Sequence, residues 1–157
     1  MTQTNALGRL TAMGFAPCGE WTAQDDKLVL KLTACANARN VLYAFVIEDA
    51  VMYIGKTVTT LKTRMQGYRL PSSTQSTNLR NNRTLRQVIE SGKLVTIYVL
   101  PDNGLLHYGG FHVNLAAGLE DSLVRDMRPP WNGGKKETGE PPLTTPPSNN
   151  SLQVSAG

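Results

Sequence analysis

Residues 41–55 constrain the fold of this chain more than any other segment. They read VLYAFVIEDAVMYIG, which is an apolar run, a short acidic turn at Glu48 and Asp49, and a second apolar run. Two strands joined by so short a turn must pair antiparallel, because parallel strands need a crossover of about a dozen residues or more. The sequence therefore predicts an antiparallel β-hairpin.

The register of this hairpin decides which side chains share a face. If Ile47 faces Val51 across a three-residue turn, Tyr43 lies opposite Gly55. Tyr43 and Tyr53 then project from the same face of the sheet, because side chains alternate along a strand. The glycine leaves room beside the two rings. We therefore expect a pair of neighbouring phenols on one face.

The Gly55-Lys56-Thr57 triplet also closes the phosphate-binding loop of nucleotide hydrolases. That loop, G-x-x-x-x-G-K-[ST], requires a glycine where this sequence has Ala50. The residues in between are VMYI, which are typical of a strand and not of a loop whose N–H groups turn around a phosphate. We set the nucleotide hydrolase aside and expect no nucleotide cofactor.

A helix is predicted after the hairpin, over residues 57–69. Leu61, Met65 and Tyr68 recur at the spacing of one helical face. Arg64 lies about 60° to the side of that stripe. We expect it at the boundary between core and solvent, where a cleft can form.

The rest of the chain adds a basic helix over 78–91, a third strand over 93–101 and a helix over 115–127. Asn114 is a favourable N-cap for the last helix. The composition shifts to Pro, Thr, Ser, Asn and Gly near the C-terminus, which indicates a flexible tail. The expected organisation is an N-terminal extension, a central domain and a tail, over residues 1–40, 41–132 and 133–157.

The positive charge of the chain is concentrated in one quarter of its length. The net charge is +4, and residues 56–93 hold a run of lysines and arginines against the single acid Glu90. A surface that neutralises nucleic-acid phosphates has this signature, whereas the alternative is a solvated helix pair with incidental charges. The candidates for nucleic-acid contact are Lys56, Lys62, Arg69, Arg80, Arg83 and Arg86.

Glu120 lies on the apolar side of its helix. On a wheel of residues 115–127 the apolar side chains cover an arc of about 140° that includes Glu120 but not Asp121, Arg125 or Asp126. An unpaired carboxylate aimed at a core is costly. Either a buried ion pair with an arginine satisfies it, or it is offered to a hard cation such as Mg²⁺, which often takes one or two protein oxygens.

Composition excludes several other classes of protein. Hydrophobic residues make up 40% and charged residues 18%, as in a globular protein and unlike a disordered or membrane protein. The N-terminus lacks a secretion signal, so we expect a cytoplasmic protein without membrane contact. Cys18 and Cys35 lack the pattern of a disulfide framework or zinc site. His107 and His112 are interpreted as exposed or loop-packing histidines.

Five features in order resemble the GIY-YIG nuclease family. They span about residues 41 to 132 and comprise Val41-Leu42-Tyr43, Tyr53-Ile54-Gly55, Arg64 in the following helix, Glu120 in a later helix and Asn132 just beyond it. The first motif has Val-Leu in place of Gly-Ile, and the second is intact. The resemblance implies an α/β (α+β) fold with a small three-stranded antiparallel sheet flanked by helices. It also implies a phosphodiester-cleaving site with one divalent ion, Mg²⁺ or Mn²⁺.

The resemblance suggests a role for each motif residue. Tyr43 would act as general base or would position the attacking water, assisted by Tyr53, because cations such as Lys56 and a metal favour a phenolate. Arg64 would clamp the phosphate with its planar fork of donors, and Glu120 would hold the metal.

Two roles are considered for each of two further residues. Tyr68 either takes part directly or packs. Asn132 either fixes the local backbone or holds a site water.

The sequence thus predicts a metal-dependent DNA endonuclease, as a monomer or a homodimer. The alternative is a non-catalytic nucleic-acid-binding module of the same fold, which would bind DNA in a salt-sensitive manner without cleaving it. No expected catalytic position is substituted, which favours the enzyme.

Overall fold

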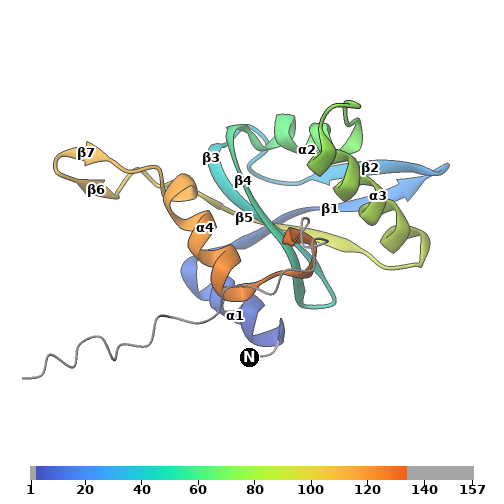
Figure 1. Ribbon diagram of the computed structural model, residues 1–157, viewed down its shortest axis with the longest axis horizontal. Coiled ribbons are helices and arrows are strands. Elements are labelled where there is room, and N and C mark those ends of the chain that lie inside the picture. Colours follow the sequence, from blue (N-terminus) through green and yellow to red (C-terminus); the bar gives the residue numbers. More distant parts are fainter. Residues whose placement is uncertain (1–2, 134–157) are drawn as a thin grey trace, which may run out of the picture.

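A five-stranded antiparallel sheet with helices on both faces makes up the body of the protein (Figure 1). The computed structural model describes residues 3–133. The strand order is β2-β1-β5-β3-β4, so β2 and β4 are the edges. The strands are β1 (Ala16–Gln24), β2 (Lys27–Leu32), β3 (Arg39–Ile47), β4 (Ala50–Thr60) and β5 (Val95–Pro101).

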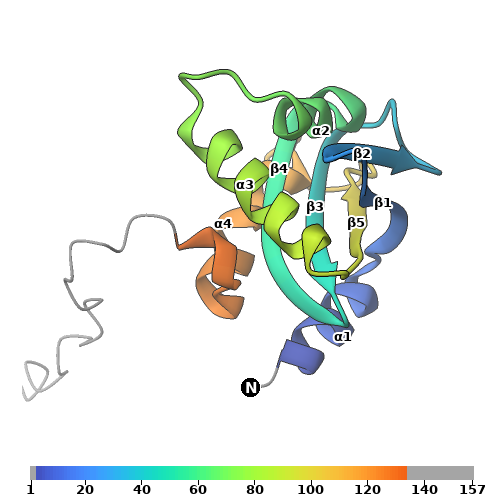
Figure 2. The ribbon, with the colours of Figure 1, turned by 90° about the vertical axis from the view of Figure 1, so that its right-hand side faces the viewer.

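The helices form two layers, one on each face of the sheet (Figure 2). Helices α2 (Leu61–Arg69) and α3 (Ser76–Glu90) cover one face, and α1 (Gln3–Met13) and α4 (Leu115–Met127) cover the other. A 3₁₀ turn, η1 (Pro130–Asn132), follows α4, and a small hairpin, β6 (His107–Tyr108) with β7 (Phe111–His112), precedes it. Among residues 3–133, no helix is long and apolar enough to cross a bilayer.

The sheet has five strands where the sequence predicted three. Residues of the N-terminal extension form the β1–β2 hairpin, and β1 pairs with β5. The alternating residues Lys27–Leu32 form β2, the edge strand of this hairpin. We missed β1 because its register shifts between Pro17 and Gly19. The shift leaves Cys18 and Trp21 as the buried residues of the strand. They are three positions apart, so the strand lacks the alternation of buried and exposed side chains by which strands are predicted.

The β3–β4 hairpin confirms the predicted facing of Tyr43 and Gly55 but not the predicted turn. Ile47 pairs with Ala50 and not with Val51, so the turn has two residues, Glu48 and Asp49. Both have positive φ angles, 49° and 69°, as a turn matching the strand twist requires. A register shift between Phe45 and Val46 compensates for the shorter turn and restores the expected pairing beyond it.

The helix boundaries differ from prediction mainly at the start of α2. We predicted a helix from residue 57, but residues 57–60 continue β4, and α2 begins at Leu61 after its N-cap Thr60. Helix α4 spans the predicted residues 115–127 and is capped by Asn114. The expected flexible tail lies outside the described residues from 134 onward.

Strand alternation divides the core between the two faces. Tyr43 and Tyr53 lie in the core beneath α2 and α3, whereas Leu42 and Ile54 lie in the core beneath α1 and α4. Lys56 follows Ile54 by two residues and shares its face. Because β4 is an edge strand, side chains from both faces border the same open edge of the sheet.

Candidate active site

Arg64 is the centre of a polar cluster on the α2/α3 face. Its Nε donates to Tyr43 Oη at 3.0 Å, its Nη2 to Tyr68 Oη at 2.8 Å and its Nη1 to Asn78 Oδ1 at 2.9 Å. The guanidinium carbon also lies 4.4 Å from the centroid of the Tyr68 ring, a cation–π contact. Arg64 is half-buried, as its position beside the apolar stripe predicted.

Three phenols complete this cluster. Tyr43 Oη and Tyr68 Oη are 2.6 Å apart, and Tyr68 Oη donates to Tyr53 Oη at 3.4 Å. Tyr43 and Tyr68 are fully buried, and Tyr53 retains 7% exposure. The structure therefore brings together Arg64, the motif tyrosines Tyr43 and Tyr53, and the further candidate Tyr68.

Burial raises the pKa of Tyr43 above its ordinary value, and the pKa of Tyr68 is raised for the same reason. Desolvation disfavours the phenolate, and the neighbouring phenols add to this effect. The Arg64 guanidinium lowers both values but does not offset burial. Burial therefore outweighs the effect of Arg64 at Tyr43, whereas the expected help of Lys56 and a metal to a phenolate stays a prediction.

Gly55 lies against the cluster from β4. A Cβ at this position would come within 2.6 Å of Tyr43 Cζ and Oη and within 2.9 Å of Tyr53 Cε2. Real Cβ atoms essentially never approach so closely. The glycine is needed because the phenol of the paired strand lies directly over its Cα.

Substituting Gly55 with alanine is expected to lower the free energy of unfolding by about 1–3 kcal/mol, because fully buried rings cannot shift without strain. Urea denaturation of the two proteins measures this difference. Gly8→Ala in α1 is the matched control, since no atom lies within 4 Å of its Cβ and alanine favours a helix. Equal unfolding midpoints for wild type and Gly55→Ala would contradict the close packing.

Asn78 supports Arg64 and was not recognised in the sequence. It is 4% exposed, and its Nδ2 donates to Gln75 Oε1 at 2.9 Å while its Oδ1 accepts from Arg64. Asn82 Nδ2 donates to the carbonyl oxygen of Tyr68 at 2.8 Å. One signal was available: Asn78 lies on the buried side of α3 with Leu85. A polar residue on an apolar face indicates a buried partner.

Lys56 and Glu120 form an ion pair on the opposite face of β4. Lys56 Nζ lies 3.3 Å from Glu120 Oε1, and the side chains are 43% and 25% exposed. Glu120 is therefore not buried among apolar side chains as the helical wheel predicted, and its partner is a lysine where we weighed an arginine. The wheel failed because it cannot show that this part of α4 lies near an open sheet edge. Lys56 itself was predicted from the sequence as a phosphate contact.

Asn132 caps the open edge of β4 at one residue, Ile54. Its Oδ1 accepts from Ile54 N at 2.9 Å, and its Nδ2 donates to Ile54 O at 2.8 Å. The side chain thus replaces a neighbouring strand at the residue between Tyr53 and Gly55. Of the two roles weighed for Asn132, contact with the local backbone is the one observed.

Most predicted nucleic-acid contacts lie together on the α2/α3 layer. Lys62, Arg83 and Arg86 are exposed, whereas Arg69 and Arg80 are half-buried. Arg86 Nη2 also donates to Asp26 O at 3.1 Å, which ties α3 to the β1–β2 turn. A groove of about 450 Å³ between that hairpin and α2 is lined by Gln24, Asp25, Lys27, Leu28, Val29, Leu30, Gln66 and Arg69. Lys56 lies apart from this group, beside Glu120.

Glu120 is suited to a hard divalent cation bound through one carboxylate, and less suited to a metal that needs several protein ligands. No group of three or more His, Cys, Asp or Glu side chains gathers anywhere in residues 3–133. Mg²⁺ and related ions keep several waters and are bound through one or two carboxylates plus substrate phosphates, whereas structural zinc requires four protein ligands. A single partly exposed carboxylate satisfies the first requirement and not the second.

The fold is shared with a solved endonuclease structure. The protein matches a mutant of bacteriophage T4 EndoII with a TM-score of 0.61 and 22% identity over 80% of this chain and 96% of that one. A weaker match is restriction endonuclease Hpy188I in complex with product DNA, with a TM-score of 0.47, 19% identity and 93% coverage of each chain. No protein-family model and no curated protein sequence matches. The match to T4 EndoII confirms, at the level of the fold, the resemblance to GIY-YIG nucleases.

Proposed function

We propose that this protein is a metal-dependent endonuclease of the GIY-YIG type that hydrolyses phosphodiester bonds in DNA. The observation that carries this proposal is the arrangement along β4. Arg64, which binds Tyr43 and Tyr68, lies with three linked phenols on one face of the strand, and a lysine–glutamate pair lies on the other. The shared fold with T4 EndoII supports the proposal, as does the basic α2/α3 layer.

Arg64 is the group we assign to the scissile phosphate. Its hydrogen bonds to Tyr43, Tyr68 and Asn78 hold the guanidinium in one orientation and leave further N–H groups free of these partners. A preorganised fork of donors stabilises negative charge that develops on the phosphate oxygens, and it does so without reorganisation during the reaction.

The phenols would orient the attacking water through their hydroxyl groups. The raised pKa values of Tyr43 and Tyr68 keep these two side chains protonated at neutral pH, so each can donate one hydrogen bond and accept others. Tyr53 is the most exposed of the three and is the one assigned to contact the water directly. Tyr43 and Tyr68 would act through Tyr53 and Arg64.

Glu120 and Lys56 would serve the leaving oxygen and its phosphate. Glu120 would hold one Mg²⁺ or Mn²⁺, which when bound supplies positive charge against the departing oxygen. Lys56, now paired with Glu120, would then turn to a phosphate oxygen. Both side chains are partly exposed, so neither needs to leave the core to do so.

Incubation of the purified protein with supercoiled and linear DNA tests the proposal. We expect nicked or cut products in Mg²⁺ or Mn²⁺ and none when EDTA is added, because the leaving oxygen then lacks its cation. Mapping the ends of the products identifies which bond is broken. Salt-sensitive binding without cleavage in either metal would instead support the non-catalytic binding module.

A further inference from the structure

The β6–β7 hairpin and its flanks expose an unusual amount of apolar surface. Leu105, Tyr108 and Phe111 are 78%, 84% and 78% exposed, and Leu106 is 46% exposed. The hairpin projects from the body of the protein between β5 and α4 (Figure 1). Clustered exposed apolar residues mark a contact surface. The arginine–phenol cluster and the Lys56–Glu120 pair make no use of them.

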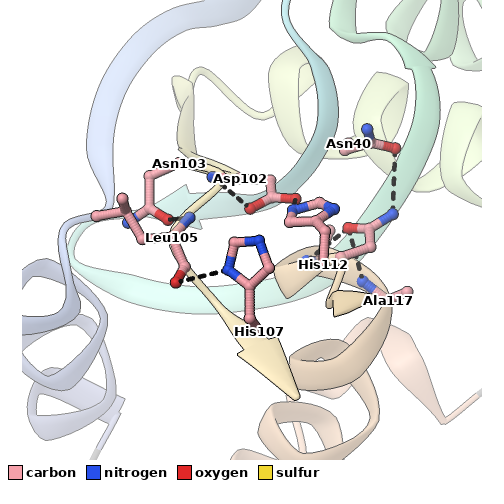
Figure 3. A network of polar contacts seen from close by, with 10 residues as sticks. Asn40, Asp102, Asn103, Leu105, His107, His112 and Ala117 are labelled. Atoms are coloured by element: carbon pink, nitrogen blue, oxygen red, sulfur yellow. Dashed lines mark hydrogen bonds and ion pairs between the residues drawn. The ribbon is translucent and has the colours of Figure 1, made fainter. Parts of the chain in front are cut away.

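The base of the hairpin is held by a network of polar contacts (Figure 3). Asp102 Oδ1 accepts from Gly104 N at 3.0 Å, and its Oδ2 lies 2.8 Å from His112 Nε2. Val113 N donates to Leu106 O at 2.7 Å. The tip is therefore presented from a defined base.

The exposed part of the hairpin carries no negative charge. Asp102 is the only acidic residue of segment 102–113, and its side chain is 5% exposed. The hydrogen bond from Gly104 N lowers its pKa most, and His112 lowers it further. His107 and His112 pack with ring centroids 5.7 Å apart. An apolar tip without exposed carboxylates does not repel a polyanion and offers no charge to attract a basic partner.

The shape of the hairpin and its place in the chain favour nucleic acid over protein. Its strands have two residues each, so the tip is a narrow ridge, whereas a stable protein interface buries about 800 Å² per partner. Segment 102–113 leads directly into α4. At 1.5 Å per residue, Glu120 lies about 9 Å along the helix from Asn114, so one helix joins the base of the hairpin to this carboxylate.

We propose that the β6–β7 hairpin binds DNA bases close to the cleaved bond, with Tyr108 and Phe111 stacking on bases or wedging between them. Aromatic and apolar side chains make such contacts in proteins that unstack base steps or hold single strands. The proposal rests on the proposed function and adds a base-contacting element to it. Gly109 and Gly110, with positive φ angles of 60° and 83°, form the turn between the two aromatic residues.

Binding of duplex DNA that contains 2-aminopurine, measured in EDTA, tests this element apart from cleavage. The double variant Tyr108→Ala, Phe111→Ala is expected to bind about tenfold more weakly or worse and to lose the fluorescence change of unstacking. The slope of affinity against salt should stay the same, because no phosphate contact is removed. Leu94→Ala, an equally apolar and 48% exposed position outside the hairpin, is the control and should bind as wild type does.

Unchanged affinity and fluorescence in the double variant would overturn the proposal. If the same variant also lost self-association in sedimentation, the tip would be a contact between copies of the chain. Circular dichroism checks that the variants are folded. If the wild-type protein cleaves DNA and the variant binds as wild type does, the proposed nuclease function stands and only the proposed role of the hairpin is wrong. If the wild-type protein neither binds nor cleaves DNA, the proposed function itself is wrong.

Discussion

The Arg64→Ala variant is expected to cleave DNA about a thousandfold more slowly than wild type, or worse. Arginines that stabilise the transition state of phosphoryl transfer contribute about 10³–10⁵ to the rate. In this protein the guanidinium also holds Tyr43 and Tyr68 through hydrogen bonds of 3.0 and 2.8 Å, so its loss disturbs the phenols as well. The rate of supercoiled plasmid nicking in Mg²⁺ measures the effect.

Stability must be followed alongside activity for this variant. The substitution leaves Asn78 Oδ1 without its donor, which we expect to lower the free energy of unfolding by about 1–3 kcal/mol. Arg64→Lys keeps the charge but not the planar fork, and it should remain strongly impaired. Thr63→Ala changes an exposed residue of the same helix and should cleave normally. Cleavage at the wild-type rate by a folded Arg64→Ala protein would refute the assigned role.

Glu120→Gln is expected to lower cleavage by about a hundredfold or more while leaving the protein folded. Glutamine has nearly the same shape but is a neutral, weak ligand for a hard cation, so the charge opposite the leaving oxygen is lost. The ion pair with Lys56 also disappears, but because both partners are partly exposed this costs little stability. Nicking rates over a range of Mn²⁺ concentrations measure the effect, and partial recovery at high Mn²⁺ would locate the defect in metal binding.

Asp121→Asn provides the control on the same helix. The Asp121 side chain is 81% exposed and pairs with Arg125 at 2.7 Å, so its neutralisation should change neither the cleavage rate nor the stability appreciably. A double-mutant cycle with Lys56→Met separates the ion pair from catalysis. If Glu120→Gln cleaved DNA normally and its only defect were the coupling to Lys56, Glu120 would be a structural partner and the proposed metal role would be wrong.

Local features of the sequence were sufficient to predict the central β3–β4 hairpin. The pairing of Tyr43 with Gly55 was predicted, although the turn is one residue shorter than expected, because a register shift compensated for it. Helix α4 was predicted residue by residue, since its N-cap Asn114 and its apolar repeat lie within one short segment. The motif tyrosines and Arg64 meet as expected, because the hairpin and α2 are adjacent along the chain.

Contacts between distant segments could not be predicted from the sequence. Strand β1 joins the sheet through β5, far along the chain, and its shifted register concealed it. Asn78 was overlooked because its partner Arg64 lies on another helix. The raised pKa of Tyr43 was not predicted for the same reason, since desolvation depends on everything packed around its ring.

What the sequence by itself determined is therefore the set of reactive side chains and the local elements that carry them. Only the tertiary structure decided their environment: it buried the phenols and left Glu120 paired with Lys56 at an open sheet edge. The physical reason is that strand pairing and helix capping act between near neighbours in the chain. Burial and electrostatics sum over all neighbours in space, and most of those neighbours are remote in sequence.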